Sequence, residues 1–120
     1  TLRIISENPI FGIGYGNIKT VMEAQTGLYI NSHNTPVGIA VDYGLCAITF
    51  FVATIALSLG ALLKTVKLAS SRQERLFVRS IISALGAMLI HGLFHELYIH
   101  FMLWFFVALG AVKSRGRRIA

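Results

Sequence analysis

Residues 45–63 form an apolar run that constrains the fold of this chain more than any other feature. The run reads LCAITFFVATIALSLGALL and contains no charged side chain over its nineteen residues. An α-helix needs roughly 20 apolar residues to cross a bilayer. Upstream, Asn34-Thr35-Pro36 offers a capping side chain and a proline suited to a first helical turn. We therefore predict a transmembrane helix over residues 37–63.

The composition of the whole chain favours a membrane over water. Only 13% of the 120 residues are charged and 55% are hydrophobic, whereas soluble domains carry about 25% charged residues. A soluble chain of this length buries only about two-thirds of its surface, too little to hide so much apolar material. The single cysteine, Cys46, excludes an internal disulfide and a paired-cysteine metal or redox site. The chain starts at Thr1 without a signal peptide, and we expect it to be the C-terminal part of a larger protein.

The positions of the basic residues predict how often the chain crosses the bilayer. Residues 64–79 carry five lysines and arginines against one acid, and the tail 113–120 carries four more. Short cytoplasmic loops collect such residues, so both stretches should lie inside and residues 80–112 between them should form a hairpin. A single tilted helix over 80–112 is the alternative, and it would place the tail outside. The net charge of +6 is thus read as a topology signal, and nucleic acid is not an expected partner.

The predicted fold class is an all-α, polytopic membrane protein fragment with about three transmembrane helices. Residues 1–36 form an outer segment, 64–79 a basic cytoplasmic loop and 113–120 a basic cytoplasmic tail. The outer segment contains NPIFGIGYGN over residues 8–17, and we expect a short interfacial helix within 17–30. Glycines that alternate with apolar residues exclude a helix over 8–17 and indicate a loop with positive φ angles. Such a loop can present N–H groups to an anion, or it can be a plain tight turn at the membrane surface.

Three motifs follow one another in a characteristic order. NPIFGIGYGN is followed by SHN at 32–34 and by DYGL at 42–45, at the start of the apolar span. Together with the basic loop and the closing hairpin, this order resembles the O-antigen ligase and O-antigen polymerase family over essentially the whole chain. That family has a glycine loop, a histidine–asparagine pair at a helix start and an acid–Tyr–Gly–Leu segment within that helix. The chain departs from the family's pattern at Thr35-Pro36 and at Cys46-Ala47.

The resemblance implies the C-terminal part of a GT-C-type membrane glycosyltransferase in the bacterial inner membrane. Such enzymes transfer a glycan from undecaprenyl diphosphate to an acceptor hydroxyl at the periplasmic face. The acceptor is lipid A–core or another lipid-linked repeat unit, and neither a metal nor another cofactor is implied. The family's catalytic arginine lies upstream of the glycine loop. Arg3 is too close to Pro9 to match it, so we expect that arginine in the preceding part of the protein and no activity from this chain alone.

His33 is the candidate catalytic residue. A neutral imidazole can accept the proton that the acceptor hydroxyl loses as it attacks. The helix that follows has its N-terminus here, and a helix N-terminus favours anions such as a diphosphate. The alternative is that His33 is a polar interfacial residue near the cap of the helix, and Asn34 has the same two interpretations. The substrate-binding candidates are Asn34, Arg3, Gly12, Gly14, His95 and Glu96.

A polar cluster interrupts the apolar residues of 80–112, with His91, His95, Glu96 and His100. His91 and His95 have the i, i+4 spacing that metal ligands can use, but the pattern is not HExxH and we expect no metal. The cluster should form the outer apex of the hairpin, on the same side of the membrane as SHN. Ionisable residues in membranes are functional candidates, so His95 or Glu96 is expected to line the acceptor or lipid-diphosphate site.

Two other functions are compatible with the sequence. A transporter of lipid-linked sugars would need helices broken at mid-membrane and inverted repeats, whereas the glycines here lie outside the predicted span. A non-catalytic membrane scaffold would need no catalytic arginine upstream.

Overall fold

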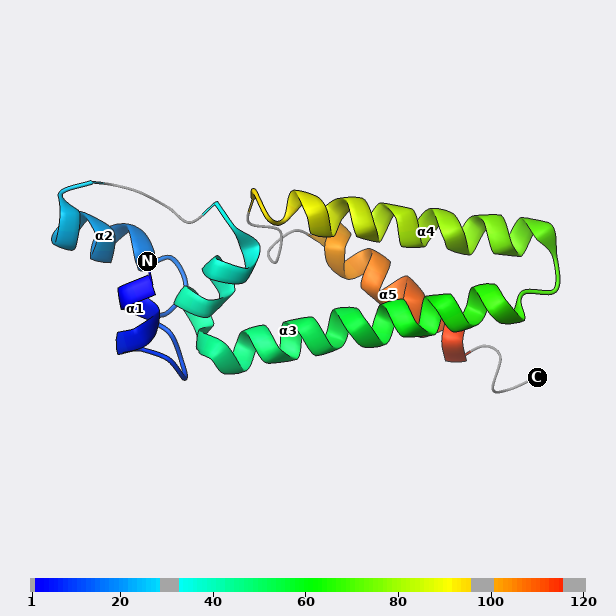
Figure 1. Ribbon diagram of the computed structural model, residues 1–120, viewed down its shortest axis with the longest axis horizontal. Coiled ribbons are helices and arrows are strands. Elements are labelled where there is room, and N and C mark those ends of the chain that lie inside the picture. The colour runs from blue at the N-terminus through cyan, green and yellow to red at the C-terminus, as the bar shows by residue number, and fades with distance from the viewer. Residues whose placement is uncertain (1, 29–32, 96–100, 116–120) are drawn as a thin grey trace. The chain divides into compact units, whose positions relative to one another are not determined.

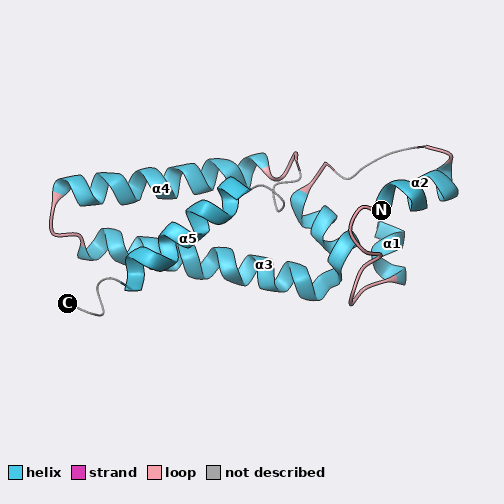
Figure 2. Cartoon of the chain, turned by 180° about the vertical axis from the view of Figure 1, so that it is seen from behind, coloured by secondary structure: helices cyan, strands magenta, loops and turns pink. Residues whose placement is uncertain are grey.

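The computed structural model describes residues 2–28, 33–95 and 101–115, and every regular element in these ranges is an α-helix (Figures 1 and 2). The chain divides into two compact units, residues 1–51 with 91–99 and residues 52–90 with 100–120. The all-α class is therefore confirmed. In chain order the helices are α1 (Leu2–Glu7), α2 (Ile18–Thr26), α3 (Thr35–Leu68), α4 (Arg72–His91) and α5 (Phe101–Arg115).

α3 is long and apolar enough to cross a membrane. It begins at Thr35, slightly before the predicted span, because the side-chain oxygen of Asn34 accepts a hydrogen bond from the amide of Val37 and caps the first turn. Large apolar side chains on this helix are exposed, including Phe50 and Leu57 at 74% and 75%. In water such a surface is unfavourable, and in a bilayer it is not. α3 therefore indicates association with a membrane.

Among the described residues, α3 is the one helix with this combination of length and apolarity. α4 carries three arginines and Glu74 in its first half, and α5 has fifteen residues. α4 ends at His91 and α5 begins at Phe101, so residues 80–112 do not form a single continuous helix.

The first unit packs α1, α2 and the beginning of α3 around a small apolar core. Ile4 of α1, Ile18 of α2 and Val41 of α3 are each less than 5% exposed and form one cluster. α2 is the short helix expected within residues 17–30, and it ends at Gly27, which has a left-handed φ of 70°. α1 was not predicted, because a six-residue helix has too few positions to show a periodic pattern.

The second unit contains residues 52–68 of α3 together with α4 and α5, which lie alongside one another in both views (Figures 1 and 2). Leu62, Val78, Leu85 and Leu103 are almost fully buried and supply one core residue or more from each helix. The buried hydroxyl of Ser58 donates a hydrogen bond of 3.0 Å to the carbonyl oxygen of Val107, which joins α3 to α5.

The basic stretch 64–79 is mostly helical, which differs from the predicted loop. α3 continues to Leu68 and α4 begins at Arg72, so only residues 69–71 connect them. The hydroxyl of Ser71 accepts a hydrogen bond of 3.0 Å from the amide of Glu74. Ser71 and Glu74 have the S-x-x-E spacing of a capping box, a helix-start signal that outweighs the polarity of the segment.

Candidate functional site

The glycine-rich loop forms hydrogen bonds with α3 at a break in that helix. Gly44 has φ 83° and ψ −179°, which interrupts the helix. In an unbroken helix the carbonyl of Val41 would accept the amide of Leu45, four residues on. Here Val41 accepts the amide of Ile13 at 2.8 Å, and Leu45 donates to the carbonyl of Pro9 at 2.8 Å. The loop thus supplies partners for backbone groups that the break would leave open.

The carbonyl oxygen of Asp42, next to that of Val41, also accepts a hydrogen bond from the loop. The amide of Gly14 donates to the carbonyl oxygen of Asp42 at 2.9 Å, and the amide of Gly12 donates to Asn8 at 3.1 Å. These two glycine amides are therefore bonded inside the protein. The arrangement favours the structural interpretation of Gly12 and Gly14 over a loop that presents its N–H groups to an anion.

Close backbone approach explains why glycine occupies both sides of this contact. Gly12 has φ 67°, and a side-chain carbon added there would meet the carbonyl oxygen of Val41. A carbon added at Gly44 would meet the carbonyl oxygen of Ile10. The combination of φ and ψ at Gly44 is essentially restricted to glycine. The two motifs NPIFGIGYGN and DYGL are therefore two halves of one structural contact.

Asp42, beside this contact, was not selected from the sequence. It is only 5% exposed, and its neighbour Tyr43 stacks on Tyr15 of the glycine loop with ring centroids 6.4 Å apart. An acid at the beginning of an apolar run was the available signal, because a buried carboxylate is rare unless structure or function requires it.

The beginning of α3 is fastened to the turn that follows α4. The side-chain nitrogen of Asn34 donates to the carbonyl of Leu93 at 2.8 Å. The amide of Thr35 donates to Gly92 at 2.8 Å, and its hydroxyl donates to the carbonyl of His95 at 2.6 Å. We call these three hydrogen bonds the α3 clip. Asn34 is thus an N-cap and a tertiary contact at once, and Thr35, which departs from the family's pattern, provides two of the three bonds.

The clip places Asn34, the residue after His33, next to the turn that follows α4. His33 is exposed and directly precedes Asn34. The rings of His91 and His95 have centroids 4.5 Å apart, and the carbonyl of His95 is part of the clip. Glu96 and His100 lie outside the described residues. In the described ranges, no group of three or more His, Cys, Asp and Glu side chains is arranged to hold a metal ion.

The amides of the first turn of α3 already have partners. Pro36 has no N–H group, Thr35 donates to Gly92, and Gly38 donates to the carbonyl of Asn34. Val37 donates to the side chain of Asn34. The N–H groups of Thr35, Val37 and Gly38 are thus all bonded within the protein.

Arg3 lies on α1 and is exposed. Its Nε donates to Oε1 of Glu7 at 2.7 Å, one helical turn away. This hydrogen bond, together with the charge of Glu7, raises the pKa of Arg3. Arg3 shares a unit with His33 but is engaged with a neighbour on its own helix.

Chemically, this unit offers the exposed imidazoles of His33, His91 and His95, and it also contains the buried side chain of Asp42. An exposed imidazole can accept or donate a proton near neutral pH. The described side chains thus suit proton transfer to or from a ligand at the surface of this unit. No family model, no curated protein and no solved structure matches this chain.

Proposed function

We propose that this chain is the C-terminal membrane part of a glycosyltransferase of the O-antigen ligase or polymerase type. The enzyme would transfer a glycan from undecaprenyl diphosphate to a hydroxyl of lipid A–core or of another lipid-linked repeat unit. This reaction would take place at the periplasmic face of the bacterial inner membrane, in surface polysaccharide biosynthesis. The support is the ordered set of motifs in the sequence and the way in which their residues contact one another.

The proposed topology has three crossings. Residues 45–68 of α3 follow the break and give about 36 Å of helix, which is sufficient for a hydrocarbon core of about 30 Å. α4 and α5 form the closing hairpin, with the basic residues of 64–79 and 113–120 on the cytoplasmic side. Residues 1–36 and the turn after α4 are then periplasmic.

One observation carries the proposal: the α3 clip holds the segment after His33 against the turn that contains His95. Asn34 and Thr35 thereby contact a turn nearly sixty residues away in the sequence, and His33 beside them is exposed.

In the proposed mechanism His33 accepts the proton of the acceptor hydroxyl. The acceptor oxygen forms a bond to the anomeric carbon of the glycan as the bond from that carbon to the diphosphate oxygen breaks. The electron pair of the broken bond leaves with undecaprenyl diphosphate. Because the first-turn amides of α3 are bonded within the protein, the charge on the diphosphate would be stabilised by basic side chains, above all by the upstream arginine that the resemblance implies.

The test uses the full-length protein in a cell that lacks its own copy. His33→Ala should reduce glycan transfer by about 100-fold to 10,000-fold, the range for loss of a general base. Gln25→Ala, on an exposed position of α2, is the control and should leave transfer unchanged. Immunoblots of the membrane fraction should show equal amounts of both variants. Transfer by His33→Ala within twofold of the control would refute the assignment.

The alternative is a transporter of lipid-linked sugars. The break at Gly44 within α3 is the observation in its favour, because transporters coordinate ions with the open carbonyls of broken helices. Here the carbonyls of Val41 and Asp42 are bonded to the glycine loop, which favours the enzyme. A non-catalytic scaffold is the third candidate, and it predicts no loss of function in His33→Ala.

A further inference from the structure

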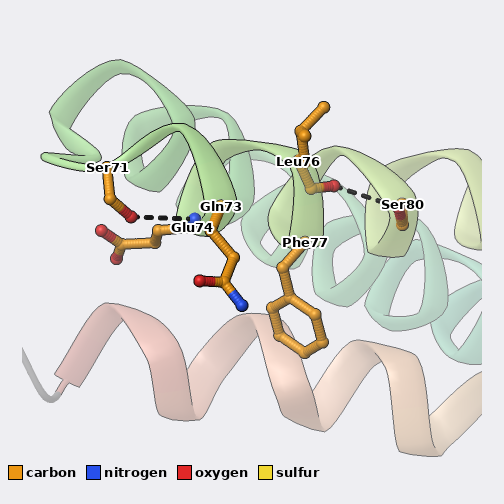
Figure 3. A pocket seen from close by; sticks show the side chains of 6 residues that line it. All are labelled: Ser71, Gln73, Glu74, Leu76, Phe77 and Ser80. Atoms are coloured by element: carbon orange, nitrogen blue, oxygen red, sulfur yellow. Dashed lines mark hydrogen bonds between the residues drawn. The ribbon is translucent and has the colours of Figure 1, made fainter.

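A hollow of about 490 Å³ lies at the start of α4 and combines polar and apolar groups (Figure 3). Phe77 and Leu76 are 56% and 52% exposed, although they belong to the second unit's packed hairpin. Gln73 and Phe77 point toward α5, the pale orange-red helix in Figure 3. The hollow is lined by Ser71, Gln73, Glu74, Leu76, Phe77 and Ser80.

A stripe of positive charge runs beside this hollow. Arg72, Arg75 and Arg79 are exposed, and their spacing of three and four residues places them on one face of α4. Lys64 and Lys67 are exposed on the last turns of α3, immediately before the 69–71 connector. Residues 64–79 contain five basic residues and one acid, Glu74, which leaves a net charge of +4. The charge on this end of the unit is complementary to an anion.

We propose that the start of α4 binds the headgroup of an anionic phospholipid. The arginine stripe would contact the phosphate, and the hydroxyls and amide of the hollow would contact the glycerol. Exposed Leu76 and Phe77 would contact the first part of the acyl chains. A soluble phosphate would contact the basic side chains but not the exposed apolar ones. The presence of exposed apolar side chains next to the basic ones therefore favours a lipid over a soluble phosphate. This site shares no residue with the proposed glycan-transfer site and does not depend on glycan transfer.

The experiment is a titration of the purified full chain in neutral detergent, followed by native mass spectrometry. The probe is dioleoyl phosphatidylglycerol, and dioleoyl phosphatidylcholine is the neutral comparison with identical acyl chains. Arg75→Gln/Arg79→Gln removes two charges from the stripe. Lys19→Glu changes the net charge by the same two units in the first unit and is the matched control. Ser80→Leu fills the hollow without a change in charge.

Each arginine near a lipid headgroup should contribute roughly fivefold in affinity, so the double variant should bind phosphatidylglycerol about 25-fold more weakly. Ser80→Leu should weaken binding as well, and the matched control should bind within twofold of the parent. Equal weakening by the arginine double variant and by Lys19→Glu would overturn the proposal, because it would reveal a response to net charge alone. Equal binding of phosphatidylcholine, or displacement of the lipid by soluble glycerol phosphate at millimolar concentration, would also overturn it. If the arginine variant fails to fold, Ser80→Leu decides the question on its own.

Discussion

The amide nitrogen of Leu45 lies 2.8 Å from the carbonyl oxygen of Pro9, and this hydrogen bond joins the candidate membrane helix to the glycine loop. A break in a helix exposes backbone groups, and an unsatisfied backbone group costs several kcal/mol in lipid. The loop residues Ile13 and Gly14 close the other exposed positions of the break. The N-terminal segment is therefore part of the structure of α3 and not only a connection to it.

Gly44→Ala should destabilise the first unit by about 2 kcal/mol or more, because alanine is disfavoured at this φ and ψ and its side-chain carbon would meet Ile10. The measurement is the thermal unfolding midpoint of the purified protein in detergent. Gly60→Ala is the control within the same helix, since no atom lies near its added carbon. It should raise stability by up to about 1 kcal/mol. Equal midpoints for the two variants would show that the break at Gly44 is not fixed by glycine.

Within the glycine loop, we expect Gly12→Ala to be more harmful than Gly16→Ala. Both residues have positive φ, at 67° and 78°, so both substitutions carry a backbone strain of about 1 kcal/mol. Only at Gly12 would the new carbon also meet the backbone of Val41 and Asp42. Limited proteolysis should cleave the Gly12→Ala loop at lower protease concentration than the Gly16→Ala loop. The reverse order would contradict the docking of the loop on α3.

Asn34 performs two tasks that two substitutions can separate. Asn34→Asp keeps an acceptor for the amide of Val37 but loses the donor to the carbonyl of Leu93. Asn34→Ala loses both. Loss of the donor should cost about 1 kcal/mol, and loss of the cap should cost about 1 kcal/mol more. Unfolding midpoints should therefore decrease from the parent to Asn34→Asp and further to Asn34→Ala; an aspartate variant less stable than the alanine variant would refute the cap.

Thr35→Val should loosen the turn after α4 with little change in volume. The substitution removes the hydroxyl that donates to the carbonyl of His95 at 2.6 Å, at a cost of about 1 kcal/mol. Hydrogen exchange should become faster in residues 92–95. Thr35→Ser retains the hydroxyl and should show parent-like exchange. Unchanged exchange in the valine variant would mean that the clip does not hold this turn.

Single cysteines test the proposed topology. In a Cys46→Ser background, a cysteine at position 33 and a cysteine at position 70 should react with a membrane-impermeant maleimide from opposite sides of the membrane. Both positions are exposed, so accessibility within the protein is not limiting. Labelling of both positions from the periplasm would contradict the proposal that α3 crosses the membrane once between them.

The sequence predicted α3 and the segment expected to contain α2, because a long uncharged run and a capping asparagine are local signals. It also marked the glycine loop, the SHN motif and the DYGL motif separately. It could not show that the loop and DYGL contact each other, because a glycine permits close backbone approach without indicating which segment approaches. Gly44 looked like one glycine in an apolar helix, and only its φ and ψ reveal the break.

Three further features of the structure were not predicted: the helical extent of residues 64–79, the role of Thr35 and the burial of Asp42. The helical extent of residues 64–79 was missed because polarity was given more weight than the Ser71–Glu74 capping box. Thr35 was regarded as a departure from a family pattern, whereas its role depends on carbonyls nearly sixty residues away in the chain. Buried Asp42 was passed over because burial depends on the docked loop, which the sequence does not display.

The closure of the α3 break by residues 9–14 has a consequence for protein engineering. A chimera that exchanges the apolar helix alone would remove the loop groups that bond the carbonyls of Val41 and Asp42 and the amide of Leu45. Residues 9–14 and 41–45 must therefore be transplanted together as one cassette. Related proteins that diverge in one of these stretches should carry a compensating change in the other.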